Sequence, residues 1–182
     1  KEEFIEKKHI IKAQPFFHHF IHKALAKEGK YNLIMNNIRN YWGKMLNSCS
    51  GTIWELWSNK YSECHAWSAT PTYDLITYIA GIKPLEPGFK KVLIEPCPED
   101  LGWVECKTPT PLGDISLELK NTTDEFNLNI NIPKDCEVII SLPKKKENNV
   151  EIDNIIQDNF VEEGDKIKIM LSGPKKSTII SC

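Results

Sequence analysis

The chain has 182 residues, of which 41% are hydrophobic and 26% are charged, an ordinary balance for a globular protein with a real core. A formal net charge of −2 argues against the basic surface that nucleic acids or anionic membranes require. No apolar run approaches the roughly 18 residues of a membrane-spanning helix. We therefore expect a neutral partner, with no nucleic acid and no membrane.

The N-terminal residues and the cysteines bear on whether the chain is longer and on its thiol chemistry. Lys1 to Lys8 include neither an initiator methionine nor the apolar stretch of a signal peptide, so we expect the sequence to continue a longer chain. Six cysteines are widely spaced and form no Cys-x-x-Cys pair. We expect idle thiols, with a Cys49–Cys64 disulfide as an open alternative, and we expect no cofactor.

Three helices are predicted in the first half of the chain. Apolar residues recur at helical spacing over 16–28, and Gly29 is placed to end that helix. A second helix, with a broad apolar arc, is predicted over 31–47. The third is predicted over 70–80, with Thr70 as N-cap and Pro71 in the first helical position.

The segment between the second and third helices has no clear period and is rich in aromatic residues. Residues 51–68 include Trp54, Trp57 and Trp67 together with Glu55 and His65. Indole faces stack on the apolar face of a sugar ring, and the two polar side chains offer hydrogen bonds to hydroxyls. Desolvation by neighbouring indoles would make Glu55 a better proton acceptor. Aromatic clusters also occur in protein cores, so a structural role for the same residues stays open.

The second half of the chain is predicted to be a β-domain. Pro and Gly in residues 83–88 indicate a linker, after which the apolar pattern alternates with a period of two. Strands are predicted at 91–95, 103–107, 115–119, 126–132, 138–140, 167–171 and 178–180. Many short alternating strands favour an antiparallel β-sandwich or jelly roll. We thus predict a helical domain over 1–83 and a β-sandwich over 84–182.

Short motifs follow one another in an order that is typical of one family. In chain order they are Pro15-Phe-Phe17, Ala24-Leu-Ala-Lys-Glu-Gly29, Tyr41-Trp42, Thr52-Ile-Trp-Glu-Leu-Trp57, Cys64-His-Ala-Trp-Ser-Ala69, Gly81-Ile-Lys-Pro84, Pro87-Gly-Phe-Lys-Lys-Val92, Ile94-Glu-Pro96 and Thr110-Pro-Leu-Gly113. Their order and spacing, up to about residue 120, resemble the C-terminal end of bacterial α-L-rhamnosidases, glycoside hydrolase family 78.

This resemblance implies a fold and an activity. The helices would be the last ones of an (α/α)₆ barrel that binds rhamnose, followed by a C-terminal β-sandwich. Enzymes of this family hydrolyse rhamnosides with inversion, and Glu55 corresponds in position to the general base. The resemblance assigns contacts with the sugar to Trp54, Trp57, His65 and Trp67.

The resemblance also implies that part of the machinery lies elsewhere. In the family, the general acid and other acidic residues precede these motifs, so we expect this polypeptide alone to have no useful glycosidase activity. We further expect apolar helix faces to be exposed and to drive formation of a homodimer through residues 16–46.

Three histidines on the first helix raise the question of a metal site. His18 and His22 have the i, i+4 spacing of a metal-binding pair, and His19 lies between them. A further ligand and the glutamate of a zinc-protease helix are not visible. We therefore predict no metal site and expect these histidines to face solvent or to line the barrel.

Other functions remain open from the sequence. A non-catalytic carbohydrate-binding sandwich would use its own aromatic residues, chiefly Trp103 and Phe126, and would not need Glu55. A purely structural module would use Trp54 and Trp57 for packing. An (α/α)₆ glycosidase for another sugar is also compatible, since Ile53 departs from the usual motif.

Overall fold

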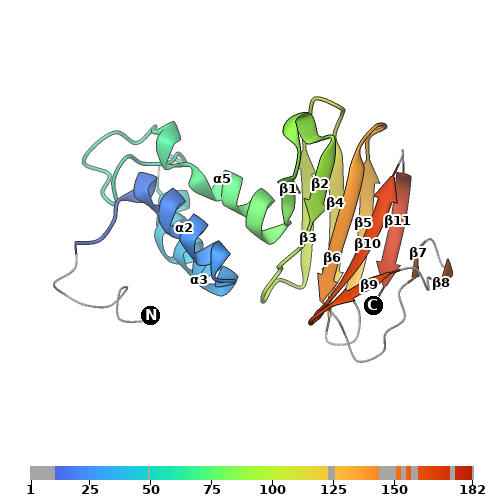
Figure 1. Cartoon of the computed structure of the whole chain (residues 1–182). Coiled ribbons are helices and arrows are strands. Elements are labelled where there is room, and N and C mark those ends of the chain that lie inside the picture. The colour runs from blue at the N-terminus through green and yellow to red at the C-terminus, as the bar shows by residue number, and fades with distance from the viewer. Residues whose placement is uncertain are drawn as a thin grey trace. The chain divides into compact units, whose positions relative to one another are not determined.

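The computed structural model describes residues 11–48, 50–122, 126–143, 151–152, 155–156, 160–172 and 175–181 (Figure 1). The chain divides into two compact units, Lys1–Asp74 and Leu75–Cys182. The predicted domain boundary lies at residue 83, within the second unit. Most of the regular structure is β-sheet, accompanied by a few helices.

The first unit is helical. It contains a 3₁₀ turn η1 (Pro15–Phe17), helices α2 (His18–Lys27) and α3 (Tyr31–Asn37), a π-helical turn η2 (Ile38–Trp42), α4 (Gly43–Leu46), a second 3₁₀ turn η3 (Ala66–Ser68) and α5 (Thr70–Asp74). The predicted helices over 16–28 and 31–47 are thus both present. Gly29 ends the first of them in the left-handed region (φ 65°), as expected of a C-terminal glycine.

The hydrophobic core of the first unit is small. Its buried apolar side chains are Ile34, Met35, Trp42 and Met45, all from the stretch predicted as one broad apolar helix. The indole N–H of Trp42 donates to the Ser68 carbonyl oxygen at 2.8 Å, which ties η2 to η3. That bond satisfies the polar atom of a buried tryptophan and anchors the far end of the aromatic-rich segment.

The second unit begins with the π-helical turn η4 (Leu75–Ile79) and contains two sheets. One sheet has the strand order β1-β2-β6-β10-β9, made of β1 (Ile82–Pro84), β2 (Lys91–Ile94), β6 (Glu137–Pro143), β10 (Lys166–Ser172) and β9 (Val161–Glu163). The other has the order β3-β4-β5-β11-β7-β8, made of β3 (Trp103–Thr108), β4 (Ile115–Asn121), β5 (Phe126–Ile132), β11 (Lys175–Ser181), β7 (Glu151–Ile152) and β8 (Ile155–Ile156). A 3₁₀ turn η5 (Pro87–Phe89) precedes β2.

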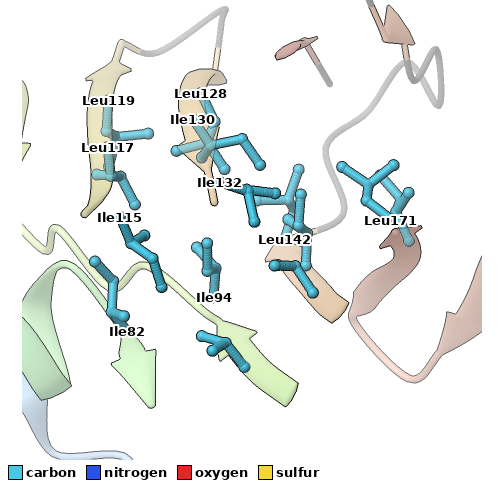
Figure 2. Close-up of a cluster of buried hydrophobic side chains, with 14 of the residues drawn as sticks. Ile82, Ile94, Ile115, Leu117, Leu119, Leu128, Ile130, Ile132, Leu142 and Leu171 are labelled. Carbon is cyan, nitrogen blue, oxygen red and sulfur yellow. The ribbon is translucent and has the colours of Figure 1, made fainter. Parts of the chain in front are cut away.

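One hydrophobic core is shared by the two sheets. Strand β4 buries Ile115, Leu117 and Leu119, while the alternate residues are more exposed, which is the period-two pattern seen in the sequence. Figure 2 shows these side chains together with those of the opposite sheet, including Ile94 and Leu142. Each fully buried Leu or Ile contributes roughly 1.5–3 kcal/mol, so this layer is the main source of stability in the unit.

Two features of the sheets differ from the sequence prediction. Strand β2 pairs with β6 in parallel, with Val92 opposite Val138, so the sandwich is mainly but not wholly antiparallel. Strand β1 overlaps the start of the stretch predicted as a linker and pairs with β2, with Ile82 opposite Ile94. A three-residue strand that includes a proline is too short to show alternation, which is why its sequence looked like a linker.

A half-buried carboxylate connects four strands of the first sheet. Glu95, just after β2, accepts hydrogen bonds from Lys166 Nζ (2.7 Å) and Lys83 Nζ (3.0 Å), and from Ser141 Oγ (3.3 Å). Burial alone would raise the pKa of Glu95, but the hydrogen bonds and charges of the two lysines outweigh burial and hold it below its usual value.

Because this pKa is depressed in the folded state, Glu95 stabilises the fold above the ordinary carboxylate pKa and loses that contribution as the pH falls through the depressed value. We expect Glu95→Gln to lower the free energy of unfolding by about 1–3 kcal/mol at pH 7, and by much less near pH 2 to 3. Thermal melts of both proteins at the two pH values measure this. Glu137→Gln, which removes an exposed partner of Lys91, is the control and should change stability by less than about 1 kcal/mol. An equal effect of Glu95→Gln at both pH values would contradict the assignment.

Candidate functional site

The aromatic-rich segment forms an irregular loop between α4 and α5 that is held by its own backbone. The N–H of Glu55 donates to the Ser62 carbonyl oxygen and the N–H of His65 to the Ile53 carbonyl oxygen, both at 2.9 Å. The loop thus doubles back on itself and presents residues 53–57 beside residues 62–65. A closed loop of this kind fixes side chains without a helical or strand period, which agrees with the aperiodic sequence.

Trp57 is the best-anchored side chain of the loop. Its indole N–H donates to the Ala13 carbonyl oxygen at 2.6 Å, and its backbone N–H donates to Gln14 Oε1 at 3.2 Å. The ring packs edge-on against Trp42 (centroids 4.8 Å apart) and against His18 (5.1 Å). Because its indole N–H is hydrogen-bonded to Ala13 and its ring is packed on two sides, Trp57 has a fixed ring orientation.

Trp54 is half-buried and is also held in place. Its indole N–H donates to Ser50 Oγ at 3.3 Å, and its backbone N–H points at Met45 Sδ at 3.4 Å. Trp54 and Trp57 both line a small open hollow, whose other lining residues are Lys12, Tyr41, Lys44 and Met45. The structure therefore brings together two of the four residues that were predicted to contact the sugar.

The hollow is too small to enclose a sugar. Its volume is about 80 Å³, whereas pockets that enclose a small molecule usually measure about 300–1,000 Å³. Taken alone, the described residues of this unit form a wall with room for one substituent. This size fits a surface that contributes one side of a larger site.

Lys12 lies over two of the aromatic rings of the hollow. Its Nζ is 3.6 Å from the centroid of the Tyr41 ring and 5.2 Å from that of Trp57, within the range of cation–π attraction. Partial burial, followed by the positive charge of Lys44, lowers the pKa of Lys12. Two cationic groups thus share this hollow.

His65 and Trp67 belong to a different aromatic cluster. Their rings meet edge-on with centroids 5.7 Å apart, and Trp67 also contacts Phe16 at 6.2 Å. Trp67 is 74% exposed. Neither residue lines the hollow of Trp54 and Trp57, so the predicted sugar-contacting residues fall into two groups on the surface of the unit.

Glu55 stands between Trp54 and Trp57 in the chain and is half-buried, but it does not line their hollow. Its backbone is fixed, since its carbonyl oxygen also accepts a hydrogen bond from Ser68 Oγ at 3.3 Å. Within the described part of the chain, its carboxylate takes part in no hydrogen bond or ion pair. Both carboxylate oxygens are therefore available to bind water or a hydroxyl group.

The histidines occupy a position that sequence reasoning missed. His18 and His22 are buried, so of the two predicted positions, facing solvent is excluded for both, and lining the barrel stays a prediction. His22 Nδ1 lies 2.7 Å from Asp74 Oδ2 with both side chains fully buried, and Thr70 Oγ1 donates to the same carboxylate oxygen at 3.1 Å. Neither His22 nor Asp74 lies on the apolar stripe predicted for its helix, and the 52-residue separation gave no reason to pair them.

The buried His18 also packs against aromatic residues of the hollow. His18 Nδ1 donates to the Gln14 carbonyl oxygen at 3.1 Å, and its ring contacts Trp57 as well as Trp42. Burial lowers the pKa of His18, and the hydrogen bond to Gln14 only partly offsets this effect. A neutral imidazole that packs against the indole helps to hold the Trp57 ring in one position.

Metal-binding and membrane-spanning features are not found in the part of the chain that the structure describes. There, no three His, Cys, Asp or Glu side chains gather in a way that could hold a metal ion. Among the same residues, no helix has the length and apolar character needed to cross a membrane. Cys64 is a free, exposed thiol, and Cys49, its possible disulfide partner, lies outside the described residues.

The aromatic residues of the β-unit do not form a paired binding face. Phe126 is 1% exposed and belongs to the core between the sheets, so its predicted role in a carbohydrate-binding module is wrong. Trp103 is 69% exposed at the start of β3. A single exposed indole is a normal surface feature.

The family model for the bacterial alpha-L-rhamnosidase C-terminal domain matches residues 81–156. That match extends past about residue 120, the point up to which the sequence itself resembles the family. A curated alpha-L-rhamnosidase of Alteromonas sp. (strain LOR) is 32% identical over 116 residues, which are 57% of this chain and 12% of that protein. Another from Formosa agariphila is 28% identical over 166 residues, which are 83% of this chain and 17% of that protein. The chain thus spans less than a fifth of these relatives.

Solved structures agree with these relatives. The GH78 family rhamnosidase of Bacillus sp. GL1 is 35% identical with a TM-score of 0.66, covering 71% of this chain and 15% of that one. The alpha-L-rhamnosidase from Dictyoglumus thermophilum, at 22% identity, shares the fold with a TM-score of 0.79 over 90% of this chain and 20% of that one. In sequence and in fold, the chain therefore corresponds to the C-terminal portion of the bacterial α-L-rhamnosidases of glycoside hydrolase family 78.

Proposed function

We propose that this chain supplies one wall of the substrate site of an inverting glycoside hydrolase that removes terminal α-L-rhamnose, with Glu55 as the general base. The observation that carries this proposal is the fixed loop of residues 53–57. Backbone hydrogen bonds fix Glu55 in this loop, where Trp54 and Trp57 flank it in the chain and are themselves anchored, and its carboxylate has no partner among the described residues. The relatives named alpha-L-rhamnosidase support the choice of sugar.

The chemistry of inversion defines what Glu55 must do. One carboxylic acid protonates the leaving oxygen, and a carboxylate on the other face of the ring activates a water molecule, with the two groups about 6.5–9.5 Å apart. Glu55 would accept a proton from that water. Trp54 and Trp57 would stack on the sugar or on its neighbour, and His65 and Trp67 would contact hydroxyl groups and the ring.

The general acid is not evident among the described residues of the helical unit. Their other carboxylates are Glu28, Glu63 and Asp74. Asp74 is fully buried and bonded to His22 and Thr70, so it cannot reach a substrate. We propose that the acid belongs to the barrel portion of the full-length enzyme, the longer chain of which this sequence would form the C-terminal part.

The helical unit would then be the closing part of an (α/α)₆ barrel, and the two sheets would be a jelly-roll-like C-terminal sandwich. The extent of the structural match supports this arrangement, since 90% of the chain superposes on only 20% of a rhamnosidase chain.

The experiment that tests this function follows the released sugar. We expect the full-length enzyme to release β-L-rhamnose first from p-nitrophenyl α-L-rhamnoside, as seen by proton NMR before the anomers equilibrate. We expect the 182-residue chain by itself to hydrolyse the same substrate no faster than buffer. Release of the α anomer would refute inversion. Saturable turnover by the chain alone would refute the proposal that the general acid lies outside this chain.

The exposed aromatic residues of η1 and α2 support a further proposal on assembly. Phe16, Phe17 and Phe20 are 46%, 59% and 52% exposed, and their rings contact one another. Exposed apolar patches of this kind tend to be covered by association. We propose that the isolated chain forms a homodimer through residues 16–46.

Light scattering at micromolar concentration tests the dimer. We expect the chain to have twice the monomer mass, and the double substitution Phe17→Ser with Phe20→Ser to shift it toward the monomer. Tyr61→Ser, which removes a 62% exposed aromatic side chain elsewhere on the unit, should leave the mass unchanged. A monodisperse monomer for the unaltered chain would contradict the proposal.

A further inference from the structure

The hollow between Trp54 and Trp57 has an electrostatic character that a neutral sugar does not need. Lys12 and Lys44 both line it, and the remaining lining residues are aromatic or Met45. Among the residues that the structure describes, no acidic side chain lines the hollow and neither lysine has an ion pair. A site for rhamnose alone would gain little from two ammonium groups held side by side.

The two cations are close enough to affect each other. The charge of Lys44 contributes to the lowered pKa of Lys12, which means that bringing them together costs energy in this structure. Cation–π attraction to Tyr41 and Trp57 holds Lys12 in place despite this repulsion. An anion placed between the lysines would relieve the repulsion and complete the site.

The hollow also has the size and the walls for one charged substituent. Its volume of about 80 Å³ admits a group much smaller than a whole sugar ring. Both indole N–H groups are already bonded to Ala13 and Ser50, so the indoles offer faces rather than donors. Among the described lining residues, the charged hydrogen-bond donors are the ammonium groups of Lys12 and Lys44.

We infer that this hollow binds a negatively charged group, a carboxylate or a sulfate, on the sugar unit that is linked to the rhamnose. The inference rests on the proposed function and names its substrate class: rhamnosides of acidic sugars. The charged group lies between Lys12 and Lys44, and the ring that carries it stacks on the indole faces.

Matched substrates test the inference in the full-length enzyme. The substrates are α-L-rhamnosyl-glucose, α-L-rhamnosyl-glucuronate and α-L-rhamnosyl-glucose 6-sulfate, which differ only at C6. We expect kcat/KM to be higher for at least one charged substrate, and each of Lys12→Gln and Lys44→Gln to reduce that preference about two- to fivefold, as for exposed ion pairs. The preference should also decrease as ionic strength rises. Whichever charged substrate is preferred identifies the group.

Two control variants separate charge in the hollow from charge in general. Lys23→Gln removes an exposed charge from α2 outside the hollow and should leave the preference unchanged. Lys12→Arg keeps the positive charge over the aromatic rings and should retain the preference for the charged substrate. Equal kcat/KM for all three substrates would overturn the inference while leaving the rhamnosidase proposal intact. An equal loss in Lys23→Gln would also overturn it, and hydrolysis of none of the three would refute both.

Discussion

Glu55→Gln in the full-length enzyme is expected to lower kcat on an aryl rhamnoside by about 10²–10⁴-fold, the usual contribution of a general base. The amide has nearly the shape of the carboxylate but cannot accept the proton of the attacking water. In the described chain the carboxylate supports no other group, so the loop should keep its fold. We therefore expect the dissociation constant for rhamnose, measured by calorimetry, to change by only a few-fold.

Glu63→Gln is the matched control for this substitution. Glu63 is a half-buried residue of the same loop, and its bond with Thr52 is made by its backbone carbonyl oxygen, which the substitution keeps. Its kcat should stay within about twofold of the unaltered enzyme. Unchanged turnover in Glu55→Gln would remove the basis for the catalytic assignment. A loss of rhamnose binding that matches the loss of turnover would make Glu55 a binding residue instead.

Gly81→Ala is expected to lower the free energy of unfolding of the β-unit by at least about 3 kcal/mol. Gly81 has φ 76°, and a Cβ there would lie 2.0 Å from the carbonyl oxygen of Glu95 and 2.7 Å from the nitrogen of Pro96. Its own carbonyl oxygen accepts the Glu95 N–H at 3.0 Å, so the two backbones cannot separate without breaking this bond. The clash displaces β1 from β2 and disturbs the carboxylate that connects four strands.

Gly88→Ala separates backbone strain from this clash. Gly88 lies in the same unit with φ 74°, but no neighbouring atom lies within 4 Å of the position that a Cβ would take there. The cost there should be that of the left-handed conformation alone, about 1–2 kcal/mol. Urea unfolding of the two variants and the unaltered chain measures the difference. Equal losses would show that β1 and residues 95–96 do not approach as closely as described.

Local patterns in the sequence predicted those elements whose period is set by one buried face. Strands β4 and β5 alternate cleanly because one side of each packs in the core and the other faces outward. The helix ending at Gly29 was predictable because the left-handed conformation there favours glycine. In both cases the deciding interactions lie within a few residues of one another.

Features that depend on distant partners could not be predicted in this way. The parallel pairing of β2 with β6 joins Val92 to Val138, and the direction of pairing leaves no mark on a strand of only four residues. His22 and Asp74 pair across 52 residues on different helices. The sequence showed each residue on a helix but not which of them would face each other.

The candidate site was predicted in part. Trp54 and Trp57, two of the four residues to which the resemblance assigns sugar contacts, line one hollow. His65 and Trp67 instead join a cluster with Phe16, because the loop doubles back between residues 55 and 62. Lys12 and Lys44 had no recognisable motif, since exposed lysines are common and only folding brings these two to one hollow.

A crystal structure of the full-length enzyme with bound rhamnose would test the central assignment most directly. We predict that a Glu55 carboxylate oxygen lies within about 2.6–3.2 Å of a water molecule, and that this water faces the anomeric carbon on the side opposite the leaving group. A carboxylate turned away from the sugar, or another acidic residue holding that water, would contradict the role of Glu55.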